Sequence, residues 1–145
     1  VMAMTKTVVK QRRDAEGVAR AVGIPDHVDV LCEMACGAQA HMRFSAVTGL
    51  APGGEIWLYG SQGTLRLDTT TGALSGGRKG DDGLAEIHVP EAKKSSWRVE
   101  EEFINAIRGI EPVTHTTFEA GVQYMEFTEA VARSARSGRT VWLPL

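Results

Sequence analysis

The segment GEIWLYGSQGTLRLD (Gly54–Asp68) has the clearest structural pattern in this sequence. Residues with alternating character stand on either side of a Gly60–Gly63 turn, as they do on the two faces of paired strands. Ile56 and Leu58 share one face with Leu65 and Leu67. The opposite face of the first strand carries Glu55, Trp57 and Tyr59. This segment therefore predicts an antiparallel β-hairpin with one apolar face.

A second alternating region extends from His27 to Thr48 and has its turn at Cys36–Ala38. One face of this predicted hairpin carries Val28, Val30, Cys32, Met34, Ala40, Met42 and Phe44. The other face carries Asp29, Leu31, Glu33, Gln39, His41, Arg43 and Ser45. Two alternating runs around a glycine turn again indicate paired strands.

The remaining segments complete an α+β pattern. We expect further strands at 1–9, 85–89 and 140–143. A short helical turn is predicted at 14–22, and a Gly-rich loop at 69–82. Apolar residues at helical spacing predict one helix from Ser96 or Trp97 to Gly109. A Thr116–Glu119 capping box predicts a second helix that ends at Gly138.

These elements predict a largely antiparallel, open-faced sheet with two main helices packed on one face. The length of 145 residues fits a single domain, 1–145. A composition of 43% hydrophobic and 23% charged residues excludes a disordered chain or a coiled coil. The formal net charge of −2 argues against nucleic-acid binding. No apolar run approaches the roughly 18–20 residues that span a bilayer.

The cysteines and histidines predict no disulfide or metal site. On one strand Cys32 and Cys36 would lie about 13 Å apart, which is too far for a disulfide. We expect both to be small buried residues in a reducing, cytoplasmic compartment. The four histidines lack metal-binding spacing; they are His27, His41, His88 and His115. Val1 opens the chain without a secretory signal, which suggests a cut end or a trimmed sequence.

Two segments resemble the C-terminal domain of the Gfo/Idh/MocA oxidoreductases. The hairpin 54–68 is similar to the family's Ile-x-Leu-x-Gly strand and Gly-Thr-Leu turn. The segment EEFINAIRGIEPVTHTTFEAGVQYMEFTEAVARSARSGRTVWLPL (Glu101–Leu145) is similar to its two closing helices and its Val-x-Leu-Pro end. The resemblance implies a substrate-binding and oligomerisation domain of a parent enzyme that uses NAD or NADP on a sugar, polyol or related hydroxy compound.

The family's catalytic motifs are absent from this sequence. It contains no Gly-x-Gly-x-x-Gly, no Glu-Lys-Pro lysine and no Gly-x-His segment. Hydride transfer requires a nicotinamide held against the substrate. We therefore assign no catalytic residue, cofactor-binding residue or metal ligand, and expect no activity from this chain alone.

Three residues are candidate substrate contacts. Trp97 could cover a sugar ring, and Arg78 and Lys79 could meet a polar or acidic substrate. Local packing at a helix entry is an alternative role for Trp97, and a solvated loop is the alternative for both cations.

Mixed aromatic and charged residues on the open sheet face indicate a homo-oligomer interface, formed by His41, Arg43, Trp57 and Tyr59. An ordinary solvated face fits the same pattern. A stand-alone, non-catalytic dimerising or ligand-binding module of the same fold is the alternative function. A third hypothesis is a small enzyme with acid–base groups at His41, Glu33 and Arg43. The alternative role for these three residues is a structural charge network.

Overall fold

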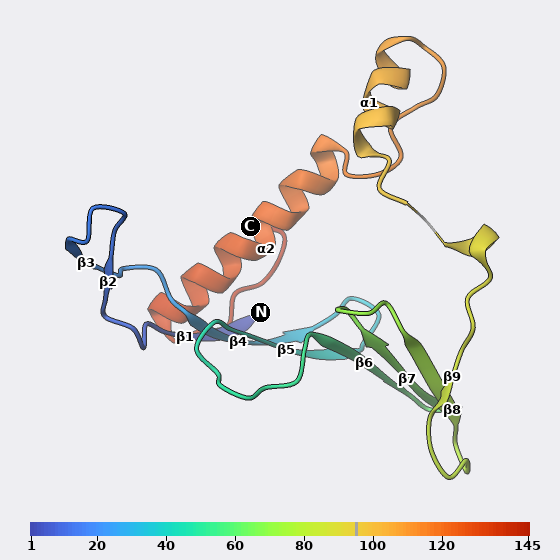
Figure 1. The fold of residues 1–145 in the computed structure, drawn as a ribbon, viewed down its shortest axis with the longest axis horizontal. Helices are drawn as coiled ribbons and strands as arrows, with labels where there is room; N and C mark the ends of the chain where they lie inside the picture. The colour runs from blue at the N-terminus through green and yellow to red at the C-terminus, as the bar shows by residue number, and fades with distance from the viewer. Residues whose placement is uncertain (95) are drawn as a thin grey trace. The chain divides into compact units, whose positions relative to one another are not determined.

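The computed structural model describes residues 1–94 and 96–145 (Figure 1). Its contacts divide the chain into two compact units. The first unit comprises Val1–Thr48 and Arg98–Leu145, and the second comprises Gly49–Trp97. The expectation of one domain over 1–145 stays a prediction. No helix among the described residues is long and apolar enough to cross a membrane.

The first unit is built on a three-stranded antiparallel sheet with the order β1-β4-β5. The strands are β1 (Met2–Lys6), β4 (His27–Glu33) and β5 (Gln39–Ser45). Val30 in the central strand lies opposite Ala3 on one side and Met42 on the other. The pairing of β4 with β5 confirms the hairpin predicted at 27–48, and the apolar residues of the two strands share a face as the alternation indicated.

Helix α2 (Phe118–Ser137) packs on one face of this sheet. The Ser134 hydroxyl accepts a hydrogen bond of 2.9 Å from the backbone N–H of Ala3. Three residues from the middle and C-terminal part of the helix pack around the buried residues Ala3, Val30 and Cys32; they are Phe127, Val131 and Ala135. The packing predicted between helix and sheet is confirmed for α2, whose small residues allow a close approach to β1.

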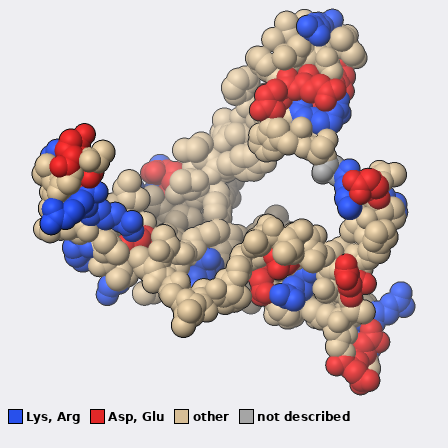
Figure 2. Space-filling model, in the orientation of Figure 1, with Lys and Arg blue, Asp and Glu red and all other residues tan. Residues whose placement is uncertain are grey.

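A two-stranded hairpin replaces the helical turn predicted at 14–22. Strands β2 (Gln11–Arg13) and β3 (Ala19–Ala21) pair in antiparallel register. The Asp14 carboxylate accepts a 2.8 Å hydrogen bond from Val18 N–H, and Gly17 adopts a φ of 80°. The helix prediction was wrong because this turn chemistry favours a reversal of the chain. Basic side chains gather over this hairpin in Figure 2.

Helix α1 (Val99–Ile107) begins later than predicted, after Arg98. Its Glu102 side chain is buried and binds the segment 114–115, which leads into α2. The N-cap of α2 is Thr117, one residue after the predicted Thr116. Thr116 itself has a φ of 51°. Gly138 ends α2 in the left-handed conformation, as predicted.

The second unit contains a four-stranded antiparallel sheet with the order β6-β7-β8-β9. Its strands are β6 (Glu55–Gly60), β7 (Gly63–Asp68), β8 (Leu74–Arg78) and β9 (Ala85–Glu86), followed by the 3-10 helix η1 (Glu91–Lys93). The hairpin predicted at 54–68 is confirmed. The loop predicted at 69–82 was wrong at β8, where the glycines serve packing: a Cβ on Gly76 would lie 2.7 Å from Ile87 Cδ1.

The predicted fold class is confirmed as α+β with open antiparallel sheets and two helices. The strands of the described residues, however, form three sheets where the sequence predicted one. No regular strand forms at 140–143, although Val141 exchanges two 2.8 Å hydrogen bonds with Val1. Cys32 is buried as predicted, but Cys36 is exposed because it lies in the turn after β4.

Candidate functional site

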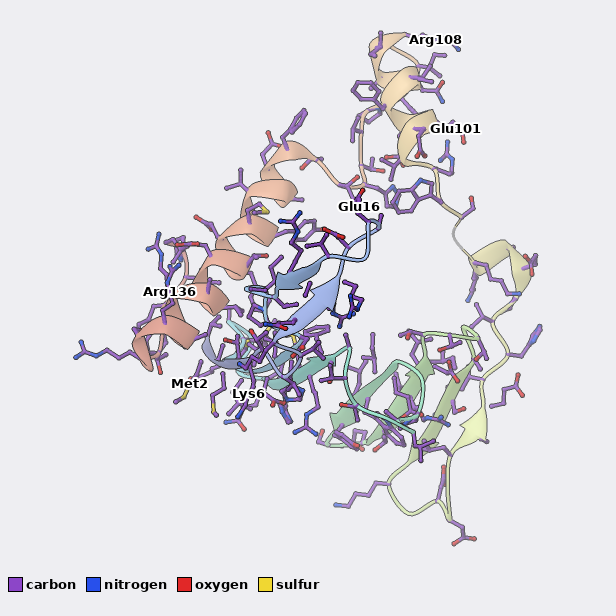
Figure 3. All side chains as sticks on the ribbon, turned by 60° about the vertical axis from the view of Figure 1, so that its left-hand side comes forward. Met2, Lys6, Glu16, Glu101, Arg108 and Arg136 are labelled. Carbon is purple, nitrogen blue, oxygen red and sulfur yellow. The ribbon has the colours of Figure 1, made fainter. Side chains whose placement is uncertain are left out.

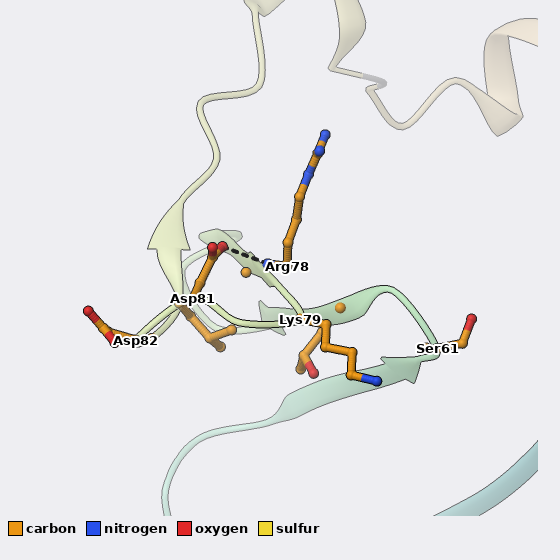
Figure 4. Close-up of a pocket in the computed structure, with 11 residues that line it drawn as sticks. Ser61, Arg78, Lys79, Asp81 and Asp82 are labelled. Carbon is orange, nitrogen blue, oxygen red and sulfur yellow. Dashed lines mark hydrogen bonds between the residues drawn. The ribbon is translucent and has the colours of Figure 1, made fainter.

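An open surface pocket of about 490 Å³, which we call the cavity, lies in the second unit, where β7 meets the loop after β8 (Figure 4). Arg78 and Lys79, two of the predicted substrate contacts, both line this cavity. The third, Trp97, is not among the lining residues. The two basic residues of the predicted site thus both border the cavity, where their side chains point in different directions (Figure 4), and its aromatic residue does not.

Glycine forms much of the cavity wall because the backbone segments there approach closely. A Cβ on Gly77 would lie only 2.6 Å from the carbonyl oxygen of Gly83. Gly63 lies opposite Arg78 in the sheet, and a Cβ there would clash with the carbonyl oxygen of Gly77. Larger residues at these positions would push the loop away from the strands, so the glycines determine the shape of the cavity.

The cavity has a balanced set of charges. Asp81 and Asp82 line it together with the two basic residues. The Asp81 carboxylate accepts a 2.7 Å hydrogen bond from the backbone N–H of Arg78, and Lys79 N–H donates to the Gln62 carbonyl at 2.9 Å. Such a mixture of donors and acceptors fits a neutral or weakly charged polyhydroxy molecule better than a polyanion.

A separate ion network lies in the first unit and contains two of the predicted interface residues. Arg43 Nε donates to Asp29 Oδ1 at 2.8 Å, and His41 Nε2 lies 3.5 Å from the same oxygen. His27 Nε2 lies 2.8 Å from Asp29 Oδ2. The hydrogen bond from Arg43, followed by that from His27, lowers the pKa of Asp29 to about 2.

His27 is a member of this network that the sequence pattern did not predict. Its position two residues before Asp29 on the same strand face was the available signal. Glu33 lies opposite Gln39, whereas His41 lies opposite Leu31 and contacts Asp29. The trio of His41, Glu33 and Arg43 that the small-enzyme hypothesis requires is therefore replaced by a network centred on Asp29.

The other two predicted interface residues belong to the second unit. Trp57 and Tyr59 on β6 stack with ring centroids 5.9 Å apart and planes 11° apart. The Arg66 guanidinium lies 5.5 Å from the Trp57 ring centroid. Glu55 accepts hydrogen bonds from Trp57 Nε1 at 2.9 Å and from Arg66 Nε at 3.1 Å, which lower its pKa.

The alternating pattern predicted all four interface residues on one sheet face. The structure places His41 and Arg43 on the three-stranded sheet and Trp57 and Tyr59 on the four-stranded one. Alternation gave the correct face within each hairpin. It could not show whether two hairpins belong to the same sheet, because that depends on pairing between distant segments.

A buried glutamate paired with a histidine was also not predicted from the sequence. Glu102 on α1 accepts hydrogen bonds from the backbone N–H groups of Thr114 and His115, both at 3.0 Å. Its Oε1 lies 2.6 Å from His115 Nδ1. These contacts, led by the two backbone donors, lower the pKa of Glu102 to about 2. The pair attaches α1 to the start of α2.

The described residues do not form a dinucleotide-binding site. Such a site uses a parallel β-α-β unit with a Gly-rich loop at a helix N-terminus. Here every strand pairing is antiparallel, and α1 and α2 begin after Arg98 and Thr117. Nor does any group of three or more potential metal ligands occur among the residues described.

No protein-family model and no curated protein matches the sequence. The fold, however, matches solved structures of oxidoreductases. An NAD binding oxidoreductase from Klebsiella pneumoniae matches 95% of this chain with a TM-score of 0.75 and 21% identity. Levoglucosan dehydrogenase in complex with NADH and L-sorbose matches 93% of it with a TM-score of 0.72 and 18% identity.

A third match is an oxidoreductase from Agrobacterium radiobacter in complex with NAD+, L-tartaric acid and magnesium. It covers 97% of this chain with a TM-score of 0.65 and 20% identity. This chain spans only 42–43% of the length of these three structures. It therefore has the fold of one part of an NAD-binding oxidoreductase, which confirms the predicted resemblance to the Gfo/Idh/MocA proteins at the level of the fold.

Proposed function

We propose that this chain is the C-terminal substrate-binding and oligomerisation domain of an NAD(P)-dependent oxidoreductase that acts on a sugar, polyol or related hydroxy compound. One observation carries the proposal. The fold match includes nearly the whole of this chain but only about two fifths of the length of each matched enzyme, and the structures of these enzymes contain NADH or NAD+. The nicotinamide cofactor of the parent enzyme would supply the hydride chemistry, and another part of that enzyme would hold it.

The cavity of the second unit supports the substrate class. Arg78 and Lys79 can donate hydrogen bonds to hydroxyl or carboxylate oxygens, and Asp81 and Asp82 can accept from hydroxyl groups. L-sorbose, present in one of the matched structures, is a small, neutral polyhydroxy molecule. In this proposal the four side chains bind and orient the substrate without taking part in hydride transfer.

Exposed apolar and aromatic residues on the open sheet faces support self-association. Leu31 on the three-stranded sheet is exposed, as are Trp57 and Tyr59 on the four-stranded sheet. Tyr and Trp combine a large contact area with a polar group and are enriched at protein interfaces. We therefore assign both faces to contacts with a second copy of the chain.

Two measurements test the proposed enzyme domain. The 145-residue chain should show no binding in a calorimetric titration with NADH, and micromolar affinity would overturn the division of labour proposed here. The full-length protein should reduce NAD+ or NADP+ in the presence of a sugar or polyol. A complete reading frame without a dinucleotide-binding domain would instead favour the stand-alone module.

A further inference from the structure

The outer face of the three-stranded sheet, opposite α2, has an apolar row that the fold leaves exposed. Strand alternation places Met2, Met4 and Leu31 on this face, and Leu31 lies opposite Met2 in the register. The exposed fractions of Met2, Met4 and Leu31 are 48%, 75% and 56%. Met2 is labelled in Figure 3. We call this surface the outer face; it is the part of the proposed self-association surface that lies in the first unit.

The charges on the outer face are balanced while its histidines are neutral. The same alternation places two cationic residues, Lys6 and Arg43, and two anionic residues, Asp29 and Glu33, on this face. A second copy can therefore dock against it through a two-fold axis without like charges in excess. This self-complementarity favours a second copy over a strongly acidic or basic partner.

Two histidines can change this balance. His27 lies opposite Lys6 on β1 and Ser45 on β5. His41 lies opposite Leu31 and close to Asp29 and Arg43. Histidine is the side chain that gains its charge between about pH 8 and pH 5. Protonation of both residues would give each copy two additional positive charges on the outer face.

The one carboxylate within reach cannot neutralise these added charges. Asp29 already binds Arg43 at 2.8 Å, and the same carboxylate faces both histidines. The pKa of Asp29, about 2, keeps it ionised throughout this pH range. Glu33 is the other anion of the outer face. Once both histidines are protonated, four positive groups (Lys6, His27, His41 and Arg43) outnumber the two carboxylates on this face.

We propose that the outer face associates with its counterpart on a second copy while His27 and His41 are neutral, and that their protonation weakens this association. The inference rests on the proposed self-association and adds its regulation. Like charges that face one another across an interface oppose binding. The dissociation constant should therefore rise about tenfold or more between pH 7.5 and pH 5.5.

Sedimentation velocity on the 145-residue chain at constant ionic strength tests this inference. The double variant His27→Gln/His41→Gln should lose most of the pH dependence. His88→Gln is the matched control, because His88 is exposed and follows β9 in the second unit. That control should retain the wild-type pH dependence. The variant His27→Lys/His41→Lys carries permanent charges and should associate about tenfold more weakly already at pH 7.5.

The possible outcomes distinguish the proposed self-association from its proposed control by pH. A wild-type chain that is monomeric at pH 7.5 at high concentration would overturn the proposed self-association and this inference with it. A dimer with the same dissociation constant at both pH values would overturn only the pH control. The lysine variant decides the matter at pH 7.5 even where acid unfolds the chain, because normal association by that variant would also overturn the inference.

Discussion

The two units show how the same sequence pattern can have different consequences for burial. Both contain an alternating hairpin, at His27–Ser45 in the first unit and at Glu55–Asp68 in the second. In the first unit, α2 covers the apolar face and Val30 is 1% exposed. In the second, Leu58 is 59% exposed, and no described residue of that unit is buried. Alternation thus determines which residues share a face, whereas burial requires a packing partner.

The largest expected effect tests this difference in burial. Val30→Ala should lower the free energy of unfolding by about 2–3 kcal/mol, because it removes two packed methyl groups and leaves a cavity. Leu58→Ala in the second unit should cost less than about 1 kcal/mol, because its side chain is largely exposed. Urea unfolding followed by circular dichroism measures both. Equal losses would show that the second unit has a core of its own.

The second prediction compares two carboxylates. The pKa of Glu102 is lowered from 4.5 to about 2, so its contribution to stability is complete above pH 4.5 and is lost as the pH falls toward 2. Glu102→Gln should lower the melting temperature at pH 7 and flatten its dependence between pH 5 and pH 2.

The control for this prediction is Glu55→Gln in the second unit. Trp57 and Arg66 lower the pKa of Glu55, but its side chain is more exposed than that of Glu102. Its substitution should change the melting temperature less, because water replaces the lost contacts. A Glu102→Gln variant with the wild-type pH dependence would contradict the role given to the buried carboxylate.

The third prediction concerns the aromatic face of the second unit. Trp57→Ala should weaken self-association about tenfold, because buried tryptophans are frequent hot spots of interfaces. Leu58→Ala, on the opposite face of the same strand, should leave the dissociation constant unchanged. Sedimentation velocity distinguishes them, and equal effects would remove the aromatic face from the interface.

The smallest expected effect concerns the cavity. In the full-length enzyme, Arg78→Ala/Lys79→Ala should raise KM for the hydroxy substrate severalfold and change kcat little, because these residues bind substrate without touching the reacting bond. Lys93→Ala/Lys94→Ala removes the same charge from the second unit, outside the cavity lining. Steady-state kinetics with the cofactor saturating compares the pairs. An unchanged KM in the Arg78→Ala/Lys79→Ala variant would exclude the cavity as a substrate site.

The amino-acid sequence alone determined the two main hairpins and the two helices of this protein. Alternation identified both hairpins and the residues that share a face in each, and the left-handed Gly138 ended α2 where the pattern required it. The sequence also indicated Arg78 and Lys79 as a pair. Short-range geometry is sufficient for such features, because neighbouring residues determine them.

The tertiary structure decided which elements share a sheet and which side chains meet. Sequence spacing could not show that Glu102 would bind His115, that β8 would pair with β7, or that two hairpins would belong to separate sheets. These contacts join segments whose approach depends on the loops between them and on close backbone packing at glycines. The partition into a packed first unit and an exposed second unit follows from where α2 lies, which no local pattern encodes.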